Sequence, residues 1–148
     1  MAQPVTARFG KFIVSLESED SPNVFVAPCG FTSKSLVMGK NLSEISIPDC
    51  DDPDLPIWLG RDVQTNTASI TGQGVLAAES VERWLAAYES TESVECQVEV
   101  EFSTGVLLFQ GHFHLETWTL GAEQGGRVTI DVSMQSDGEI TGTWTPTP

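Results

Sequence analysis

The chain has 148 residues and carries 7 Lys and Arg against 21 Asp and Glu, which gives a net charge of −14. So acidic a surface argues against wrapping nucleic acid through phosphate contacts, which needs clustered basic side chains, and against binding an anionic membrane. The length predicts one domain, residues 1–148, that buries a substantial core.

Cysteine usage and the start of the chain point to a reducing compartment. Cys29, Cys50 and Cys96 stand at wide, unrelated spacings that suit neither a disulfide framework nor a zinc site. We therefore expect free, buried thiols. The first residues lack a basic region followed by an apolar run, and no stretch has the apolar length of a membrane span. These features predict a soluble protein without a membrane anchor, made in the cytoplasm.

Apolar and polar residues alternate through most of the chain, which predicts β-strands separated by polar turns. The last four expected strands each have one apolar and one polar face, typical of an antiparallel meander that is buried on one side. Loose segments are expected at the N-terminus, residues 1–7, and at the C-terminal tail, residues 146–148. The expected strands cover residues 8–16, 24–27, 31–38, 62–73, 94–102, 107–119, 128–135 and 140–144.

One amphipathic helix is expected, at about residues 77–90. Val81, Trp84, Leu85 and Tyr88 follow the i, i+3, i+4, i+7 spacing of a single helical stripe. We expect Trp84 and Tyr88 to anchor this helix on a sheet.

A long irregular arm is expected at about residues 40–60. Its part from Ile47 to Gly60 holds four aspartates and three prolines, which exclude a helix interior and a central strand. Loops of this length are uncommon in compact domains and usually serve a function or are disordered. The apolar side chains near its end disfavour disorder, so we expect the arm to pack on its own chain, on another copy or on a ligand.

Two groups of residues could suggest metal binding. His112 and His114 share a strand face beside Glu116, but they are consecutive positions on one strand, and a solvated polar face explains them better. The aspartates of residues 49–54 lack the glycine and the distal glutamate of a calcium loop. No nucleophile elbow, phosphate loop, dinucleotide fingerprint or zinc-protease motif occurs. We therefore expect that the protein is not an enzyme and that it binds no metal and no cofactor.

The order of these features resembles the major tail tube proteins of long-tailed, siphovirus-like bacteriophages and related gene-transfer particles. The size and acidity of the chain agree with that family. The resemblance covers nearly the whole chain, and its specificity lies in the order of the motifs. The residues that carry it are 52–58 in the arm, 67–75 in a strand, 81–85 in the helix and 128–140 in the closing strands.

The resemblance implies a mainly β fold, an antiparallel two-sheet β-sandwich or barrel with one flanking helix. It implies hexameric rings that stack into a tube, with sheets joined into a barrel whose inside is the DNA channel. A long loop would reach an adjacent ring, and both chain ends would order on assembly. The implied partners are a tape measure protein, a tail terminator and distal tail proteins, within a virion tail made in the host bacterial cytoplasm.

Two hypotheses about sites follow. A channel for DNA should be hydrophilic and negative, so that DNA passes without specific binding, and the polar face of the last four strands has this character. The expected lumen-lining residues are Glu95, Glu99, Glu101, Glu116 and Asp131, with the helix on the tube exterior. The expected inter-subunit arm residues are Ile47, Asp49, Asp51, Asp52, Asp54, Leu55, Ile57 and Trp58.

Two other functions remain open at this point. A tail terminator or tail-completion protein would form a single ring instead of a tube. A non-enzymatic β-sandwich binding module would need a concave patch of exposed aromatic side chains, whereas the aromatic residues here mostly occupy expected core positions or the helix stripe.

Overall fold

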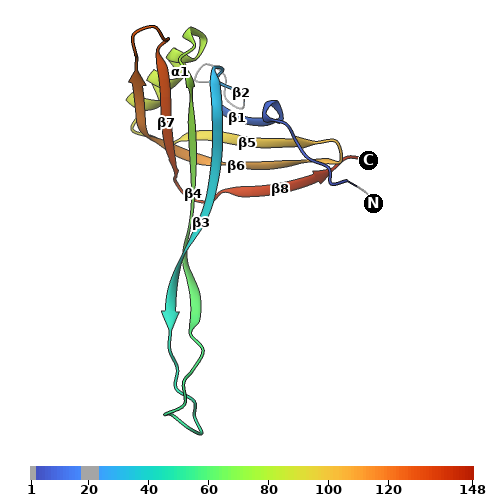
Figure 1. Ribbon diagram of the computed structural model, residues 1–148, viewed down its shortest axis with the longest axis vertical. Coiled ribbons are helices and arrows are strands. Elements are labelled where there is room, and N and C mark those ends of the chain that lie inside the picture. Colours follow the sequence, from blue (N-terminus) through green and yellow to red (C-terminus); the bar gives the residue numbers. More distant parts are fainter. Residues whose placement is uncertain (1–2, 18–23) are drawn as a thin grey trace.

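Strands make up most of the computed structural model, which describes residues 3–17 and 24–148 (Figure 1). A 3₁₀ turn, η1 (Phe9–Lys11), precedes the first strand, and one helix, α1 (Ala78–Glu89), follows the fourth. The strands are β1 (Phe12–Glu17), β2 (Phe25–Val26), β3 (Phe31–Ile45), β4 (Gly60–Val75), β5 (Val94–Phe102), β6 (Gly105–Gly121), β7 (Thr129–Ser136) and β8 (Thr141–Pro146). Within the described residues, no helix is long and apolar enough to cross a membrane.

All strand pairings are antiparallel, and β6 has three partners. The strands follow the order β2-β1-β5-β6-β7-β4-β3, with β8 also paired to β6. The half of β6 from Gly105 to Gln110 pairs with β8, and the half from Phe113 to Gly121 pairs with β7. The predicted meander is therefore right for β5, β6 and β7 and wrong for β8, which continues along the edge of β6 beyond β7. Gly138, with a φ of 93°, lies in the segment between β7 and β8 and takes a backbone conformation that favours glycine.

The sheet folds into two layers that cross (Figure 1). The transverse layer consists of β1, β5, β8 and the Gly105–Gln110 half of β6, and the long layer consists of β3, β4 and β7. The pairing of β6 with β7 shifts register between Leu115 and Thr117, and such an irregularity bends a strand. This folded sheet confirms the predicted two-layer antiparallel β fold with one flanking helix.

The core lies between the two layers and α1. Its largest fully buried side chains include Leu16, Phe113, Met134 and Trp84. Trp84 projects from α1 and meets Phe31 of β3 edge to face, with 5.8 Å between the ring centroids. Aromatic contacts of this geometry add to the stability that burial provides.

The predicted anchoring of α1 is right for Trp84 and wrong for Tyr88. Trp84 is 1% exposed, whereas Tyr88 is 61% exposed and Leu85 is also exposed. The buried residues of α1 are Ser80, Trp84 and Ala87. The small side chains of Ser80 and Ala87 let the helix approach the strands closely, and the Ser80 hydroxyl accepts a hydrogen bond from the Cys29 amide at 3.0 Å. The face of α1 that packs on the strands is thus rotated around the helix axis from the hydrophobic stripe that the sequence shows.

The expectation of buried thiols is right only for Cys96. Cys96 is buried in the core, and burial raises the pKa of its thiol to about 12. Cys29 and Cys50 are exposed, and all three cysteines are free. Cys29 follows β2, and Cys50 lies between β3 and β4, where no packed layer covers either one.

The irregular arm predicted at residues 40–60 is right for residues 46–59 and wrong for residues 40–45, which continue β3 as one side of a β-hairpin. β3 and β4 stay paired out to Ile45 and Gly60, so only residues 46–59 lack strand structure. Side-chain contacts also join β3 to β4 in this part of the hairpin, where the Asn41 amide donates to the Thr65 hydroxyl at 2.8 Å. These contacts come from residues far apart in sequence, and the alternation of β3 alone is too weak to predict them.

Replacing Trp84 with alanine should lower the free energy of unfolding by about 3 to 5 kcal/mol, because it empties a buried aromatic site. Leu85→Ala, one residue along the same helix, should cost less than about 1 kcal/mol because that side chain is exposed. Urea unfolding of the dilute protein measures both values. Equal losses for the two variants would contradict the observed orientation of α1.

Candidate interaction surfaces

The tip of the β3–β4 hairpin, residues 46–59, lies farther from the body of the protein than any other described segment (Figure 1). The Asp49 carboxylate accepts the Asp51 amide at 2.8 Å, and the Asp52 carboxylate accepts the Asp54 amide at 3.3 Å. These Asx turns organise the acidic part of the tip locally. The aspartates therefore shape the tip and also give it a dense negative charge.

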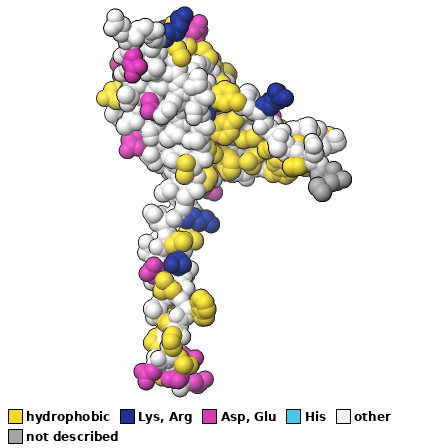
Figure 2. Space-filling view, in the orientation of Figure 1, with side chains coloured by type: hydrophobic (Ala, Val, Ile, Leu, Met, Phe, Trp, Pro, Cys, Tyr) yellow, Lys and Arg dark blue, Asp and Glu magenta, His cyan; other side chains and the backbone are white. Residues whose placement is uncertain are grey.

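Apolar side chains at the same tip are uncovered. Trp58 is 99% exposed, and Ile47 is 71% exposed. Leu55 and Ile57 are exposed as well. All eight predicted arm residues thus lie on one projecting segment, where the space-filling view shows acidic and apolar side chains next to each other (Figure 2). An indole with no neighbours in its own chain is suited to burial against a partner.

The stem of the hairpin carries an apolar stripe that the sequence did not predict. Met38 pairs with buried Ala68, which places its side chain on the core-facing side of β3, and Leu42 lies on the same side opposite Val63. Met38, Leu42 and Val63 are each about half exposed, because the stem extends past the layer that would cover them. Same-face positions at residues 38, 40 and 42 indicate that the strand continues, whereas the predicted strand ends at residue 38.

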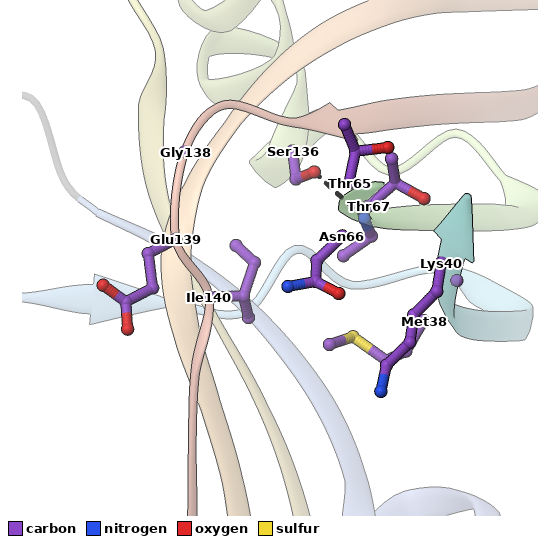
Figure 3. A pocket seen from close by; sticks show the side chains of 11 residues that line it. Met38, Lys40, Thr65, Asn66, Thr67, Ser136, Gly138, Glu139 and Ile140 are labelled. Atoms are coloured by element: carbon purple, nitrogen blue, oxygen red, sulfur yellow. Dashed lines mark hydrogen bonds between the residues drawn. The ribbon is translucent and has the colours of Figure 1, made fainter. Parts of the chain in front are cut away.

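A groove of about 790 Å³ lies at the root of the hairpin, between the stem and the segment that links β7 to β8. Met38, Asn66 and Ile140 line it, together with Lys40 and Glu139 (Figure 3). The Ser136 hydroxyl, at the end of β7, accepts the Ala68 amide at 3.0 Å. The groove therefore combines apolar side chains with a lysine and an amide.

The outer face of the transverse layer is acidic. Glu95, Glu99 and Glu101 alternate with the inward-facing side chains of β5 and lie on this face. Lys11 forms an ion pair with Glu101 at 3.3 Å. The Gln110 side chain donates a hydrogen bond to the Glu95 carboxylate. This bond, a hydrogen bond with Glu17 and the attraction of His112 hold the pKa of Glu95 below its usual value, against the opposing effect of burial.

The structure does not bring the five predicted lumen residues together. Asp131 lies on the outer face of the long layer, where it accepts a hydrogen bond from Gln73 at 3.4 Å. Glu116 is exposed at the register shift of β6, where the strand passes from one layer to the other. Glu95, Glu99 and Glu101 therefore form one surface, and Glu116 and Asp131 belong to the bend and to the other layer. The sequence pattern could not show this, because it does not reveal that β6 bends.

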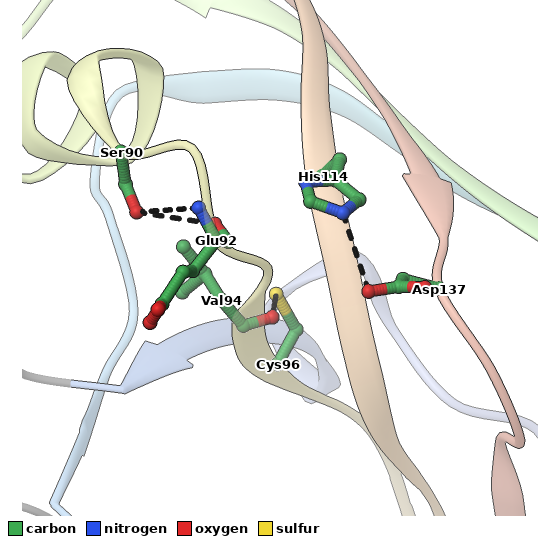
Figure 4. A network of polar contacts seen from close by, with 6 residues as sticks. All are labelled: Ser90, Glu92, Val94, Cys96, His114 and Asp137. Atoms are coloured by element: carbon green, nitrogen blue, oxygen red, sulfur yellow. Dashed lines mark hydrogen bonds and ion pairs between the residues drawn. The ribbon is translucent and has the colours of Figure 1, made fainter.

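The two predicted histidines have different surroundings. His112 lies opposite Glu95 on β5, whereas His114 Nε2 lies 3.2 Å from Asp137 Oδ2, an ion pair when the imidazole is protonated (Figure 4). The Asp137 amide also donates to the His112 carbonyl at 2.8 Å. These contacts fasten the start of the β7–β8 connection to β6. Among the described residues, no group of three or more His, Cys, Asp or Glu side chains is placed to hold a metal ion.

The uncovered hairpin tip and the apolar stem are surfaces suited to association with other protein chains. The family model of the phage tail tube protein matches residues 6–142. The chain therefore belongs to the phage tail tube protein family, and it is a self-assembling structural protein of the virion tail. No curated protein matches it.

Solved structures share this fold. The chain is similar to a protein in the tail of an empty gene transfer agent particle refined with C6 symmetry. The TM-score is 0.73 and the sequence identity 20%, and the match covers 93% of this chain and 99% of that chain. It resembles a chain of the native gene transfer agent virion, with a TM-score of 0.72, 19% identity and the same coverage. The SPP1 tail tube is also similar, with a TM-score of 0.68, 11% identity, and 96% and 80% covered.

The Gln110→Ala variant should raise the pKa of Glu95 toward its usual value of 4.5, because it removes the largest favourable contact of the carboxylate. A lowered carboxyl pKa stabilises the fold above about pH 4.5, and this stabilisation is lost as the pH falls through the folded value. NMR titration of the Glu95 side chain measures the shift. Gln97→Ala on the same face is the matched control, and an equal rise there would contradict the assigned cause.

Proposed function

We propose that the chain forms hexameric rings that stack into the tail tube, with the acidic outer face of the transverse layer lining a channel for DNA. The observation that carries this proposal is the gathering of Glu95, Glu99 and Glu101 on one face of a sheet whose strands span the width of the body. The C6 symmetry of the gene transfer agent tail supports six copies per ring.

Open strand edges support ring closure through the transverse layer. Among the described residues, β8 pairs only with β6, and the outer neighbour of β1 is the two-residue strand β2, which pairs with Leu16 and Glu17 alone. Unpaired edges of this kind invite pairing with another chain. A barrel made by joining these edges between copies leaves no exposed edge. The edges on opposite sides of the layer differ, so the contact is heterologous, and the proposed ring forms where the rotation between successive copies closes.

The charge of the outer face suits passage of DNA without capture. Counterion release drives DNA binding only where lysine and arginine contact the phosphates. On this face the carboxylates of β5 outnumber the one lysine that pairs with them, Lys11. A lumen of this composition repels the phosphate backbone weakly and evenly, so DNA slides past. No catalytic step is part of this function.

The hairpin and α1 take the remaining positions in the tube. The uncovered Trp58 and its neighbours contact an adjacent ring, which links rings along the axis. α1 packs on the body through Trp84 and turns Tyr88 and Leu85 outward, toward the tube exterior. The open ends of the tube meet a tail terminator and distal tail proteins, and the lumen holds a tape measure protein before DNA enters.

Replacing residues 47–59 with a short Gly-Ser turn should leave a folded protein that no longer forms tubes, because the variant keeps the core and loses the tip. Circular dichroism and urea unfolding should match those of the native chain, and negative-stain electron microscopy should show no tubes at concentrations where the native chain forms them. Tubes of normal length from the variant would contradict the role of the tip, and discrete single rings from the native chain would indicate a terminator.

The channel assignment can be tested with cysteine reporters in a background that carries Cys29→Ser and Cys50→Ser. We expect Glu99→Cys in assembled tubes to resist a maleimide coupled to a folded protein too large to enter the channel. The matched control Glu82→Cys, exposed on α1, should react fully. Labelling is measured as a mass shift on a denaturing gel. Protection of residue 82 with labelling of residue 99 would place the acidic face outside.

A further inference from the structure

We propose that the groove at the root of the β3–β4 hairpin is the receptor for the hairpin tip of a second copy. Trp58 of one copy packs against Met38 and Ile140 of the next, and the aspartates of the tip lie near Lys40. This inference rests on the proposed stacking of rings and names the surface that receives the hairpin.

The occupant of the groove has to come from another copy. β3 and β4 pair along the whole stem, from Phe31 opposite Gly74 to Ile45 opposite Gly60, which keeps the hairpin extended. At roughly 3.4 Å per residue, the seven residues that follow Met38, up to Ile45, carry the tip about 24 Å away from Met38. The tip therefore cannot fold back into the groove of its own chain. A contact between the tip of one copy and the root of another is heterologous and does not close on itself, which generates an open stack.

The groove matches the apolar part of the tip in size and chemistry. Its volume of about 790 Å³ falls in the range of sites that bury whole ligands, about 300–1,000 Å³. Met38 and Ile140 come from different elements and border the groove together (Figure 3). A flexible thioether adapts to an aromatic ring and contacts it favourably. Asn66, between them in the view, can hydrogen-bond an indole N–H or a tip carbonyl.

The groove also supplies a cation that is not neutralised in its own chain. Of the seven Lys and Arg residues, Lys11 and Arg61 form ion pairs with Glu101 and Glu44. Lys34 stacks on the Phe9 ring at 4.6 Å, and Arg83 donates to the Glu17 carbonyl at 3.1 Å.

The other three, Arg8, Lys40 and Arg127, have no ion pair, cation–π contact or side-chain hydrogen bond within the described residues, and Lys40 is the one that lines the groove. Glu139 also borders the groove, but its side chain extends away from Lys40 and Met38 (Figure 3). The four aspartates of the tip therefore find a lysine beside the apolar surface that receives Trp58.

Cross-linking within tubes tests the contact, because the tip already carries an exposed thiol, Cys50. In a Cys29→Ser background, Met38→Cys adds a thiol inside the groove, and Ile140→Cys adds one on its opposite wall. Val37→Cys is the matched control, since Val37 is exposed on the other face of the same strand. Assembled tubes are treated with a short bis-maleimide and run on a denaturing gel.

We expect a ladder of linked chains for Met38→Cys and for Ile140→Cys, because each copy then joins the copies before and after it. Val37→Cys and the chain with Cys50 alone should yield at least tenfold less of the linked species. A ladder that is as strong for Val37→Cys, or no ladder from either groove variant in tubes that microscopy confirms, would overturn the inference while leaving the proposed tube intact. Failure of the native chain to form tubes would instead contradict the proposed function.

Discussion

The pairing of β6 determines most of this structure, because one strand supplies hydrogen bonds to both layers. Its first half lies between β5 and β8, and its second half pairs with β7 after the register shift near Glu116. The bend turns the long layer across the transverse layer, and the space enclosed between them holds the core. α1 completes that core through Trp84. A straight β6 would leave a flat sheet whose apolar face had nothing to cover it.

The same bend separates two kinds of surface. The body buries its apolar side chains within the chain, whereas the hairpin extends past the core and exposes them. Burying an indole of about 200 Å² at about 25 cal/mol per Å² is worth roughly 5 kcal/mol before ordering costs, so leaving Trp58 uncovered is costly in the monomer. The proposed contact between copies would remove that cost, and the charge of the aspartates favours solubility of the free tip. The body of the monomer thus has a buried core, whereas the hairpin leaves apolar side chains exposed to solvent.

In the proposed tube, the acidic face and the hairpin meet different requirements. The carboxylates of β5 sit on a rigid, paired strand, so their spacing does not change when neighbours join. The tip sits at the end of a two-stranded stem, which can adjust to a neighbouring ring. In the proposed tube, the carboxylates on the paired strand face the DNA and the hairpin joins neighbouring rings, so transport and assembly rest on different elements. Neither property depends on a chemical step.

Local structure that depends on alternation and composition follows from neighbouring residues alone. β5 begins and ends at the predicted residues 94 and 102, because five apolar and four polar side chains alternate there without interruption. The position of α1, the acidic tip and the mainly β character were also predictable from nearby residues. The prolines and aspartates near Asp52 locate the tip because they exclude regular structure within a few positions of themselves.

Which elements meet depends instead on contacts between residues far apart in the chain. The extension of β3 to Ile45 depends on pairing with a strand that starts at Gly60, and the position of β8 depends on the edge that β7 leaves free on β6. The exposure of Tyr88 depends on how closely Ser80 and Ala87 let the helix approach the strands. The groove at the hairpin root joins residues about 100 positions apart. Periodicity reports which side of a strand is apolar, but long-range packing decides what that side contacts.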